Sequence, residues 1–379
     1  MRVALVHYWL VGMRGGEKVL EALCRLYPQA DIYTHCVDRA RLSPLLREKT
    51  IRTTFIQRLP GSVRHYKFYL PLMPLALEQL DLRGYDLIIS SESGPAKGVL
   101  CRADTPHICY CHTPMRYLWD FYQDYLKEAG LATRFFMRPC FHYLRLWDAA
   151  SAARPDRILA NSRAVARRVA RWWGREAHVV HPPAAVERFA PTGPGGADKP
   201  YLCFGQLVAY KRADLAVTAC LRSGRKLVVA GAGTELPRLR ALAEGSELIS
   251  FADRVPDADV PGLLASCRAL LFPGEEDFGI TPVEAMAAGR PVIAYARGGA
   301  LETVREGESG LFFNEQTPEA LCAALDAFEQ REASFRPERI AAHAATFNEA
   351  RFRREFSAEV DALLETFAPL RRQAAFTPR

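Results

Sequence analysis

The sequence predicts an α/β protein built from two Rossmann-like parallel-sheet domains that face a central cleft. Short apolar runs that suit buried strands alternate with helical patterns through the first half of the chain. The alternation stops at PTGPGGADKP, residues 191–200, and then starts again. A chain of 379 residues is long for one core and comfortable for two. Such sheets bind ligands beyond the carboxyl ends of their strands, so we expect the site there.

The first domain is predicted to occupy residues 1–190. It opens with an apolar run and a glycine pair, Gly15-Gly16, at the start of a helix that continues to Leu26. The strands predicted in this half are 3–8, 85–90, 107–111, 157–160 and 179–180. Residues 191–200 combine proline, glycine and polar residues without periodicity, which is typical of a linker.

The second domain is predicted to occupy residues 201–345. Its predicted strands are 201–205, 226–230, 247–251, 269–272, 291–295 and 311–313, with a helix at 213–221. The tail, residues 346–379, places apolar residues at helical spacing among charges, and we expect it to form a helix that covers one domain.

Composition and charge restrict the class of protein. Hydrophobic residues make up 49% and charged residues 25%, as in a globular protein, and no apolar run reaches eighteen residues. Residues 1–190 hold 28 Lys and Arg against 17 Asp and Glu, while residues 191–379 hold 22 against 26. The basic first half predicts an anionic partner, either a lipid surface or a phosphorylated acceptor. Nucleic acid ranks lower, because the sequence contains no recognised nucleic-acid module.

Ten cysteines are scattered without a C-x-x-C pair, which predicts free thiols in a reducing cytoplasm. The N-terminal stretch favours a strand that runs into a glycine-rich turn over a signal peptide. Cys109, Cys111 and His112 could suggest a metal site, but buried thiols in a strand are the stronger interpretation.

The most specific motif is FPGEEDFGITPVEAMAAGRPVIA, residues 272–294. A strand ends before it and a helix begins at Gly279, so backbone N–H groups at the helix start are available to an anion. Glu276 lies in the loop and Glu284 in the first turns of the helix, and carboxylates accept hydrogen bonds from sugar hydroxyls. The pattern therefore suits a sugar attached to a phosphate. The alternative is a solvated loop acid and a helix-start acid that the macrodipole favours.

This string resembles the E-x7-E donor motif of the retaining glycosyltransferases of family four. Nearly the whole chain resembles GT-B enzymes of that family, and CHTPMRYLWD, NSR and the PP turn look like bacterial mannosyltransferases of O-antigen and exopolysaccharide assembly. The resemblance implies a GT-B fold in which the second domain holds the nucleotide-sugar and the first holds the acceptor. It also implies a C-terminal helix that crosses back to the first domain.

Roles in the donor site follow from the resemblance. Glu276 and His112 would orient the sugar, while Lys211 would bind the diphosphate. Gln206 stands where the family carries an arginine, and Arg212 either supplies the missing cation or is a helix-start surface residue. The donor-binding residues that the resemblance implies are Gly15, Gly16, Gln206, Arg212, Gly231, Gly233, Arg254, Val255, Phe278, Gly279, Ile280 and Glu284, the last for the ribose hydroxyls.

The acceptor-side candidates are Arg116, Trp119 and Asp120, on the loop that follows His112, and Asn161, for which helix capping is the alternative. The D-x-D pattern at 257–259 precedes a helical pattern with a proline, so we interpret it as a helix start. The resemblance is to metal-independent enzymes, and we expect neither a metal nor a cofactor.

The sequence thus predicts a retaining hexosyltransferase that moves mannose from GDP-mannose onto a hydroxyl of a lipid-linked oligosaccharide in cell-surface polysaccharide synthesis. The basic and aromatic stretch 134–145 suits an anionic leaflet, or else an amphipathic core helix broken by Pro139. We therefore expect a cytoplasmic protein, peripheral on the inner face of the plasma membrane. A UDP-sugar donor, a sugar-nucleotide epimerase and a non-catalytic nucleotide-sugar-binding protein remain as alternatives.

Overall fold

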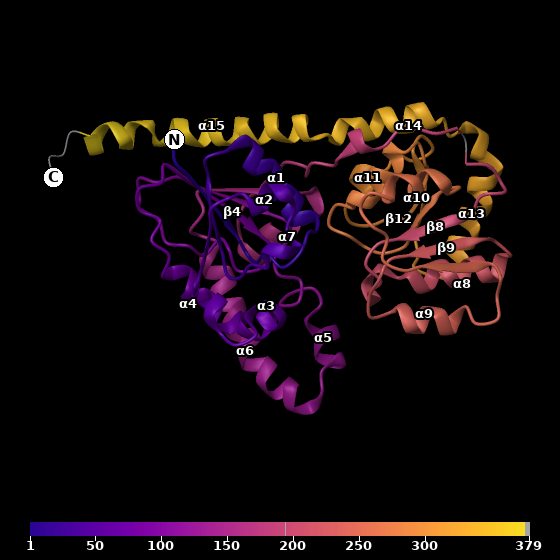
Figure 1. The fold of residues 1–379 in the computed structure, drawn as a ribbon, viewed down its shortest axis with the longest axis horizontal. Helices are drawn as coiled ribbons and strands as arrows, with labels where there is room; N and C mark the ends of the chain where they lie inside the picture. The colour runs from indigo at the N-terminus through magenta and orange to yellow at the C-terminus, as the bar shows by residue number, and fades with distance from the viewer. Residues whose placement is uncertain (194, 376–379) are drawn as a thin grey trace. The chain divides into compact units, whose positions relative to one another are not determined.

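The computed structural model describes residues 1–193 and 195–375, which divide into two compact units (Figure 1). The first unit is Met1–His181 together with the chain from Phe352 onward, and the second is Pro182–Arg351. Each unit contains one parallel sheet with helices on both faces. The predicted fold class, two Rossmann-like parallel-sheet domains, is confirmed.

The first sheet has seven strands in the order β3-β2-β1-β4-β5-β6-β7, all parallel. The strands are β1 (Val3–His7), β2 (Asp31–Thr34), β3 (Ile51–Thr53), β4 (Leu87–Glu92), β5 (His107–Cys111), β6 (Arg157–Ala160) and β7 (His178–Val179). The helices are α1 (Gly15–Leu26), α2 (Pro44–Arg47), α3 (Ser62–His65), α4 (Met73–Glu78), α5 (Tyr122–Glu128), α6 (Leu131–Ser151) and α7 (Arg163–Trp173). Alternate residues of β1 point to opposite faces, so Leu5 packs with α1 and Val6 packs with α4.

The second sheet has six parallel strands in the order β10-β9-β8-β11-β12-β13. The strands are β8 (Tyr201–Phe204), β9 (Leu227–Ala230), β10 (Ile249–Ala252), β11 (Leu270–Phe272), β12 (Val292–Tyr295) and β13 (Gly310–Phe313). The helices are α8 (Ala213–Ser223), α9 (Leu236–Leu242), α10 (Val260–Ser266), α11 (Ile280–Ala287), α12 (Ala300–Thr303), α13 (Pro318–Arg331) and α14 (Pro337–Ala344). The order reverses between β8 and β11, which puts a topological switch point at their carboxyl ends.

Every strand predicted from the sequence is present, with ends shifted by at most two residues. Two strands were missed, β2 and β3, because four and three residues are too few to display a period. They pair beside β1 and form one edge of the first sheet. The expected cleft between the domains stays a prediction.

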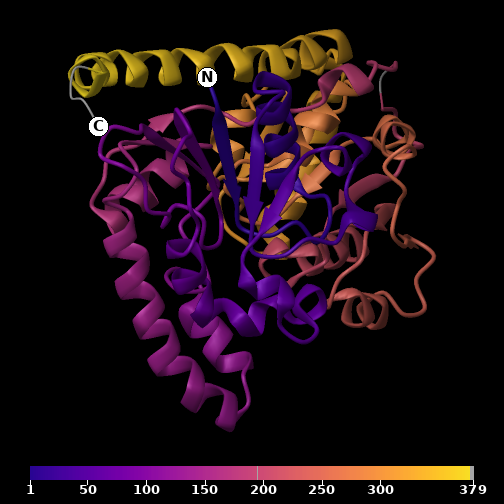
Figure 2. The ribbon, with the colours of Figure 1, turned by 60° about the vertical axis from the view of Figure 1, so that its left-hand side comes forward.

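The C-terminal tail forms helix α15 (Glu349–Ala375), which begins in the second unit and packs on the first. Phe352, Phe356 and Val360 are buried in the same core as residues of α1 and the first sheet. Figure 2 shows the helix, in yellow, running along the first unit. Glu359 also accepts a hydrogen bond from Arg157, on β6, at 2.9 Å. The apolar spacing seen in the sequence therefore covers the first domain.

The boundary between the units differs from the predicted linker at 191–200. The chain enters the second unit at Pro182, and residues 191–193 already pack on that unit. Arg290, fully buried, donates hydrogen bonds to the carbonyl of Gly193 at 2.8 Å and to the hydroxyl of Thr192. A buried guanidinium needs acceptors for all its N–H groups, and the segment supplies two of them.

Buried and half-buried histidines make the first unit sensitive to acid. Burial lowers the pKa of His35 and that of His112 to about 4. Burial and the positive charge of Arg154 lower the pKa of His107 to about 3. These groups bind protons near pH 6.5 in the unfolded chain, so the folded unit loses stability as the pH falls from about 6.5 towards 4. We expect each histidine to cost about 2 kcal/mol of unfolding free energy by pH 5.

Tryptophan fluorescence measures this effect directly, because all five tryptophans of the chain lie in the first unit. The urea midpoint followed by fluorescence should fall strongly between pH 7 and pH 5. The second unit carries a single histidine with a lowered pKa, His343, so its transition, followed by circular dichroism, should move less. A fluorescence midpoint that is unchanged at pH 5 would contradict the prediction.

Candidate functional site

An ion pair lies at the carboxyl edge of the second sheet, next to the switch point. Lys211 ends a short 3-10 helix, η5 (Ala209–Lys211), that follows β8, and Glu276 lies in the loop after β11. Because β8 and β11 are neighbours, their following loops meet, and Lys211 Nζ lies 2.7 Å from Glu276 Oε1. Both side chains are about one-quarter exposed, so the pair remains accessible to a ligand.

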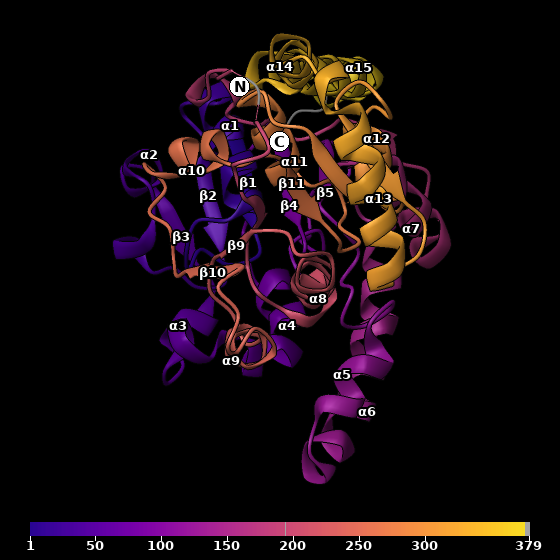
Figure 3. The ribbon, with the colours of Figure 1, turned by 90° about the vertical axis from the view of Figure 1, so that its right-hand side faces the viewer.

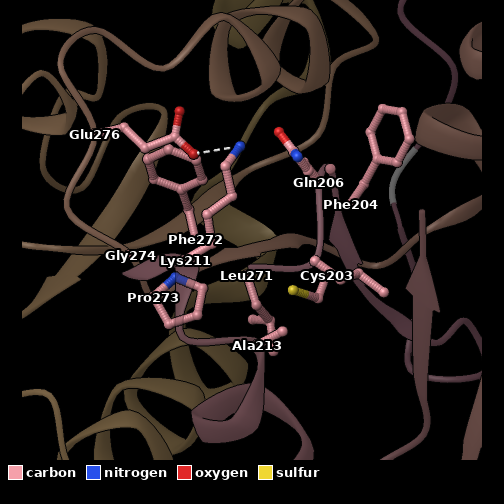
Figure 4. Close-up of a pocket in the computed structure, with 12 residues that line it drawn as sticks. Cys203, Phe204, Gln206, Lys211, Ala213, Leu271, Phe272, Pro273, Gly274 and Glu276 are labelled. Atoms are coloured by element: carbon pink, nitrogen blue, oxygen red, sulfur yellow. Dashed lines mark ion pairs between the residues drawn. The ribbon is translucent and has the colours of Figure 1, made fainter. Parts of the chain in front are cut away.

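The pair lines a pocket that Figure 4 shows in close-up. Burial disfavours a charged Lys211, but the carboxylate of Glu276 outweighs it, so the pKa of Lys211 is raised. A fixed positive charge is therefore present at neutral pH. Gln206 lines the same pocket, and its amide extends to the same side as the Lys211 ammonium (Figure 4). The expected arginine position is thus occupied by a neutral donor and acceptor.

Glycines allow the loops that carry the pair to approach each other. A Cβ on Gly274 would lie 2.7 Å from the Cα of Lys211, and a Cβ on Gly298, where φ is +63°, would overlap the carbonyl oxygen of Glu276. Gly299 N–H donates to that same carbonyl at 2.8 Å. The loop after β12 therefore fixes the backbone of Glu276, and side chains larger than glycine would displace it.

The predicted donor residues Gly231 and Gly233 have a packing role that the sequence did not reveal. A Cβ on Gly231 would overlap the carbonyl oxygen of Gly205, and a Cβ on Gly233 would overlap that of Leu207. Leu207 N–H also donates to Ala232 O at 3.0 Å. The glycine-bearing loop after β9 therefore holds the backbone of the pocket loop after β8.

The helix start predicted at Gly279 is present. Gly279 precedes α11 with a φ of +85°, which only glycine adopts without strain. Phe278 and Glu284 are buried, and Ile280 is half-buried. The E-x7-E motif thus places Glu276 at the pocket and Glu284 inside the second unit, in the second turn of α11.

The remaining donor candidates follow their strands as predicted. Arg212 immediately precedes α8 with a φ of +52° and pairs with Asp214 at 3.1 Å. Within residues 1–193 and 195–375 it is the one non-glycine residue with a positive φ. Arg254 is exposed beyond β10, and Val255 packs against the second core.

The D-x-D pattern ends at a helix start, as interpreted from the sequence. Asp259 precedes α10, although its side chain makes no capping hydrogen bond, and Asp257 pairs with Arg188 at 3.0 Å. In the described part of the chain, no three His, Cys, Asp or Glu side chains form a group that could hold a metal ion. Cys109 and Cys111 are buried thiols that pack with α7.

In the first unit, His112 follows β5 and lies beside the glycine pair. Its Nε2 is 2.9 Å from Ser91 Oγ, and a Cβ on Gly16 would approach that nitrogen to 3.6 Å. Gly15 and Gly16 are the first residues of α1, so the helix N-terminus adjoins the half-buried imidazole. The structure thus brings together three of the predicted site residues.

A fully buried charge network supports this part of the first unit. Lys97 Nζ lies 3.2 Å from Glu92 Oε1 and 2.5 Å from Asp148 Oδ1. Asp148 Oδ2 accepts hydrogen bonds from the indoles of Trp119 and Trp173, both at 2.8 Å. The two carboxylates outweigh the burial of the ammonium and raise the pKa of Lys97, so the lysine stays charged.

Two acceptor-side candidates are engaged within the unit. Trp119 donates to the buried network and stacks on Trp172 with ring centroids 4.9 Å apart, while Asp120 pairs with Arg168 at 2.9 Å. Both residues therefore attach the loop after β5 to α6 and α7. Their predicted contact with an acceptor stays a prediction.

The other two acceptor-side candidates lie in the loops that follow β5 and β6. The guanidinium of Arg116 lies over the ring of Phe121 at 4.0 Å. Asn161 is buried and accepts a hydrogen bond from Ser162, whose hydroxyl caps α7. The helix capping that was the alternative for Asn161 is therefore present, but the hydroxyl of its neighbour Ser162 makes it.

Sequence reasoning missed Glu92, Lys97 and Asp148. A charged residue in the last position of a buried strand, as Glu92 is, was the available signal, because such a group needs a partner nearby. The partner on α6 is 51 residues from Lys97, a separation that no local pattern reveals.

Comparison with known families accounts for both units. The model for Glycosyltransferase Family 4 matches residues 13–188, and the model for Glycosyl transferases group 1 matches residues 187–346. The two models together match residues 13–346, and the two sheets have the arrangement of the GT-B fold. A solved structure of Anabaena HepE in complex with UDP has the same fold, with a TM-score of 0.70 and 16% identity over 96% of this chain and 100% of that one.

Curated relatives are more similar in sequence. A D-inositol 3-phosphate glycosyltransferase of Acidothermus cellulolyticus is 29% identical over 230 residues, 53% of this chain and 51% of that protein. An alpha-1,3/1,6-mannosyltransferase of Schizosaccharomyces pombe is 25% identical over 366 residues, 82% of this chain and 70% of that protein. The chain therefore spans about half the length of the first relative and 70% of the second.

We expect Lys97→Met to destabilise the first unit. The substitution leaves Glu92 and Asp148 buried without a cation, and breaking a buried ion pair from one side costs about 3–5 kcal/mol. Urea unfolding followed by tryptophan fluorescence measures the change. Lys127→Met is the control, because Lys127 is exposed and its pair with Asp124 is long, at 3.7 Å. A loss below about 1 kcal/mol at Lys97 contradicts the assignment.

Proposed function

We propose that this protein transfers a hexosyl group from a nucleoside-diphosphate sugar, GDP-mannose, to a hydroxyl of a lipid-linked oligosaccharide. The observation that carries the proposal is the Lys211–Glu276 pair, 2.7 Å apart at the carboxyl edge of the second sheet. A departing diphosphate needs a fixed cation, and a sugar hydroxyl needs an acceptor. The pocket supplies one group of each kind.

The ammonium of Lys211 can bind a ligand in addition to Glu276. An ammonium has three N–H donors, and the contact with Glu276 uses one, so Lys211 can also bind phosphate oxygens. The start of α11, whose first backbone N–H groups have no partner inside the helix, lies three residues beyond Glu276 and suits the same anion. In this proposal Glu284 holds the ribose hydroxyls, as the resemblance implies.

The resemblance to family four extends the proposal to retention of configuration. The bond between the sugar carbon and the diphosphate breaks, the acceptor oxygen attacks from the same face, and its proton moves to the departing diphosphate. No side chain is then the nucleophile. His112 would contact the donor sugar from the first domain, which also binds the acceptor.

The choice of donor rests on the activities and ligands of similar proteins. The relative from Schizosaccharomyces pombe that covers 82% of this chain is a mannosyltransferase, whereas the Anabaena structure contains UDP. A UDP-sugar is therefore the second candidate donor. An epimerase would consume donor without acceptor, and a non-catalytic binding protein, which Gln206 makes worth testing, would release no product.

Thermal unfolding in the presence of GDP, GDP-mannose, UDP and UDP-glucose tests the donor. A ligand at a hundred times its dissociation constant adds about 2.7 kcal/mol, which raises the midpoint by several degrees. We expect a shift with the guanine nucleotides. A shift with uridine nucleotides alone replaces the donor, and no shift with any nucleotide contradicts a nucleotide-sugar site.

Variants of the pocket connect binding to turnover. Lys211→Ala should remove the shift and lower kcat by about 100- to 1000-fold, because one preorganised charge is lost, and Glu276→Ala should also lower turnover strongly. Lys226→Ala is the matched control, since Lys226 is exposed at the opposite, amino end of β9. Turnover of Lys211→Ala at the wild-type rate excludes the assigned role.

We also propose that helices α5 and α6 contact an anionic membrane. The two helices extend beyond the rest of their unit (Figure 3), and Leu131, Phe135 and Phe136 near their tip are 84%, 74% and 71% exposed. Basic side chains flank them on the same helices. Helix α6 continues through Pro139, so the predicted break is absent. Among the described residues, no helix is long and apolar enough to cross a bilayer.

Sedimentation with lipid vesicles tests this surface. We expect binding to vesicles that contain phosphatidylglycerol and loss of most of it in Phe135→Ser/Phe136→Ser, because each buried phenylalanine contributes about 1.5–3 kcal/mol. Leu242→Ser, an exposed leucine on α9, is the control. Equal binding by the double variant and the wild type rules out this surface.

A further inference from the structure

A single hydroxyl connects two histidines in the first unit. Ser91 Oγ lies 3.0 Å from His7 Nδ1 and 2.9 Å from His112 Nε2, and Ser91 and His7 are both buried. The Ser91 hydroxyl has one proton to donate, and its oxygen has two lone pairs that can accept hydrogen bonds. The direction of these two hydrogen bonds therefore decides which nitrogen of each imidazole carries a proton.

The other nitrogen of His7 selects between the two directions. Nε2 of His7 is buried and has no hydrogen-bond partner in the described part of the chain. If Ser91 donated to His7, this Nε2 would carry a proton with no acceptor, and buried N–H groups without an acceptor are rare and costly. If instead His7 Nδ1–H donates to Ser91, then Ser91 donates to His112 Nε2, and every buried proton has an acceptor.

We infer that Ser91 and His7 are positioning residues that hold His112 as the neutral Nδ1–H tautomer, so that His112 offers a hydrogen-bond donor to an oxygen of the sugar substrate. The inference rests on the proposed function for the identity of that substrate. The Nδ1 of His112 has no hydrogen-bond partner within residues 1–193 and 195–375, and the side chain is half-buried. It is therefore the nitrogen that can meet a ligand.

Packing keeps the ring from turning. Tyr110 and Tyr8 lie edge-on to His112, with ring centroids 5.2 and 6.4 Å away. A Cβ on Gly16 would overlap the hydroxyl of Tyr8, so the start of α1 closes the same side. Burial also lowers the pKa of His112 to about 4 and that of His7 well below its ordinary value, which keeps both rings neutral at pH 7.

Nitrogen NMR of the full-length protein labelled with ¹⁵N-histidine observes the tautomer directly. We expect His112, assigned by its loss in His112→Gln, to carry its proton on Nδ1 between pH 6 and pH 8. Proton on Nε2, or a protonated ring in this range, overturns the inference. This readout needs no substrate and does not depend on the transfer reaction.

Two matched pairs of variants test the positioning role. Ser91→Ala removes the hydroxyl and should give His112 as a mixture of tautomers, whereas Ser91→Thr keeps the hydroxyl. His7→Leu removes the donor, whereas His7→Asn keeps an N–H near the position of Nδ1. We expect kcat to fall up to about tenfold in Ser91→Ala and His7→Leu and to recover in their partners, because one hydrogen bond is worth about 1 kcal/mol.

Nucleotide binding separates this inference from the proposed function. The stabilisation by GDP should be unchanged in Ser91→Ala, since Lys211 and Glu276 carry that interaction in the second unit. If the wild type transfers no sugar but His112 shows the Nδ1–H tautomer, the proposed function fails and the positioning stands. If sugar transfer is normal in Ser91→Ala and His7→Leu while their tautomers change, the positioning role is excluded.

Discussion

The ammonium of Lys97, buried between the carboxylates of Glu92 and Asp148, is the contact on which the site of the first unit depends. Taking three charges out of water is costly, so the elements that carry them must meet with all their hydrogen bonds made. The backbone carbonyl of Glu92 also accepts the N–H of His112 at 2.8 Å, and the carboxylate of Asp148 accepts the indole N–H of Trp119. The loop between His112 and Trp119 is therefore attached at one end to the backbone of Glu92 and at the other end to the carboxylate of Asp148.

The second unit positions Lys211 and Glu276 by a different means, namely glycines in the loops around them. Gly274, Gly298 and Gly299 allow three loops to approach at backbone distance around Lys211 and Glu276, and no buried charge is needed. The cost is conformational entropy, since each glycine is more flexible in the unfolded chain. In return the pocket stays partly open, and the charge of Lys211 remains available to an anion, whereas that of Lys97 is fully enclosed.

Local patterns in the sequence predicted most of the fold. The spacing of apolar residues identifies a strand or helix, and the glycines and prolines that end it lie within a few residues. The strand ends at Cys111 and Ala160 and the helix start at Gly279 were all predicted. Contacts between distant residues could not be predicted in this way. The hydrogen bonds of Arg290 to residues 192–193, which move the domain boundary, and the contact of Trp119 with Asp148 depend on burial, which no short pattern encodes.

The backbone of Arg212 is relevant to the question of whether this residue adds a second positive charge beside Lys211. Its left-handed backbone, with φ at +52°, costs about 1–2 kcal/mol for a residue other than glycine. Its pair with Asp214 is partly exposed, and such pairs return about 1 kcal/mol at most. Glycine at this position would remove the cost without loss of the helix. Strain that local contacts do not offset is typical of functional positions. The lining of the pocket, however, includes Lys211 and Ala213 but not Arg212, whose guanidinium pairs with Asp214, so the role of a second cation stays a prediction.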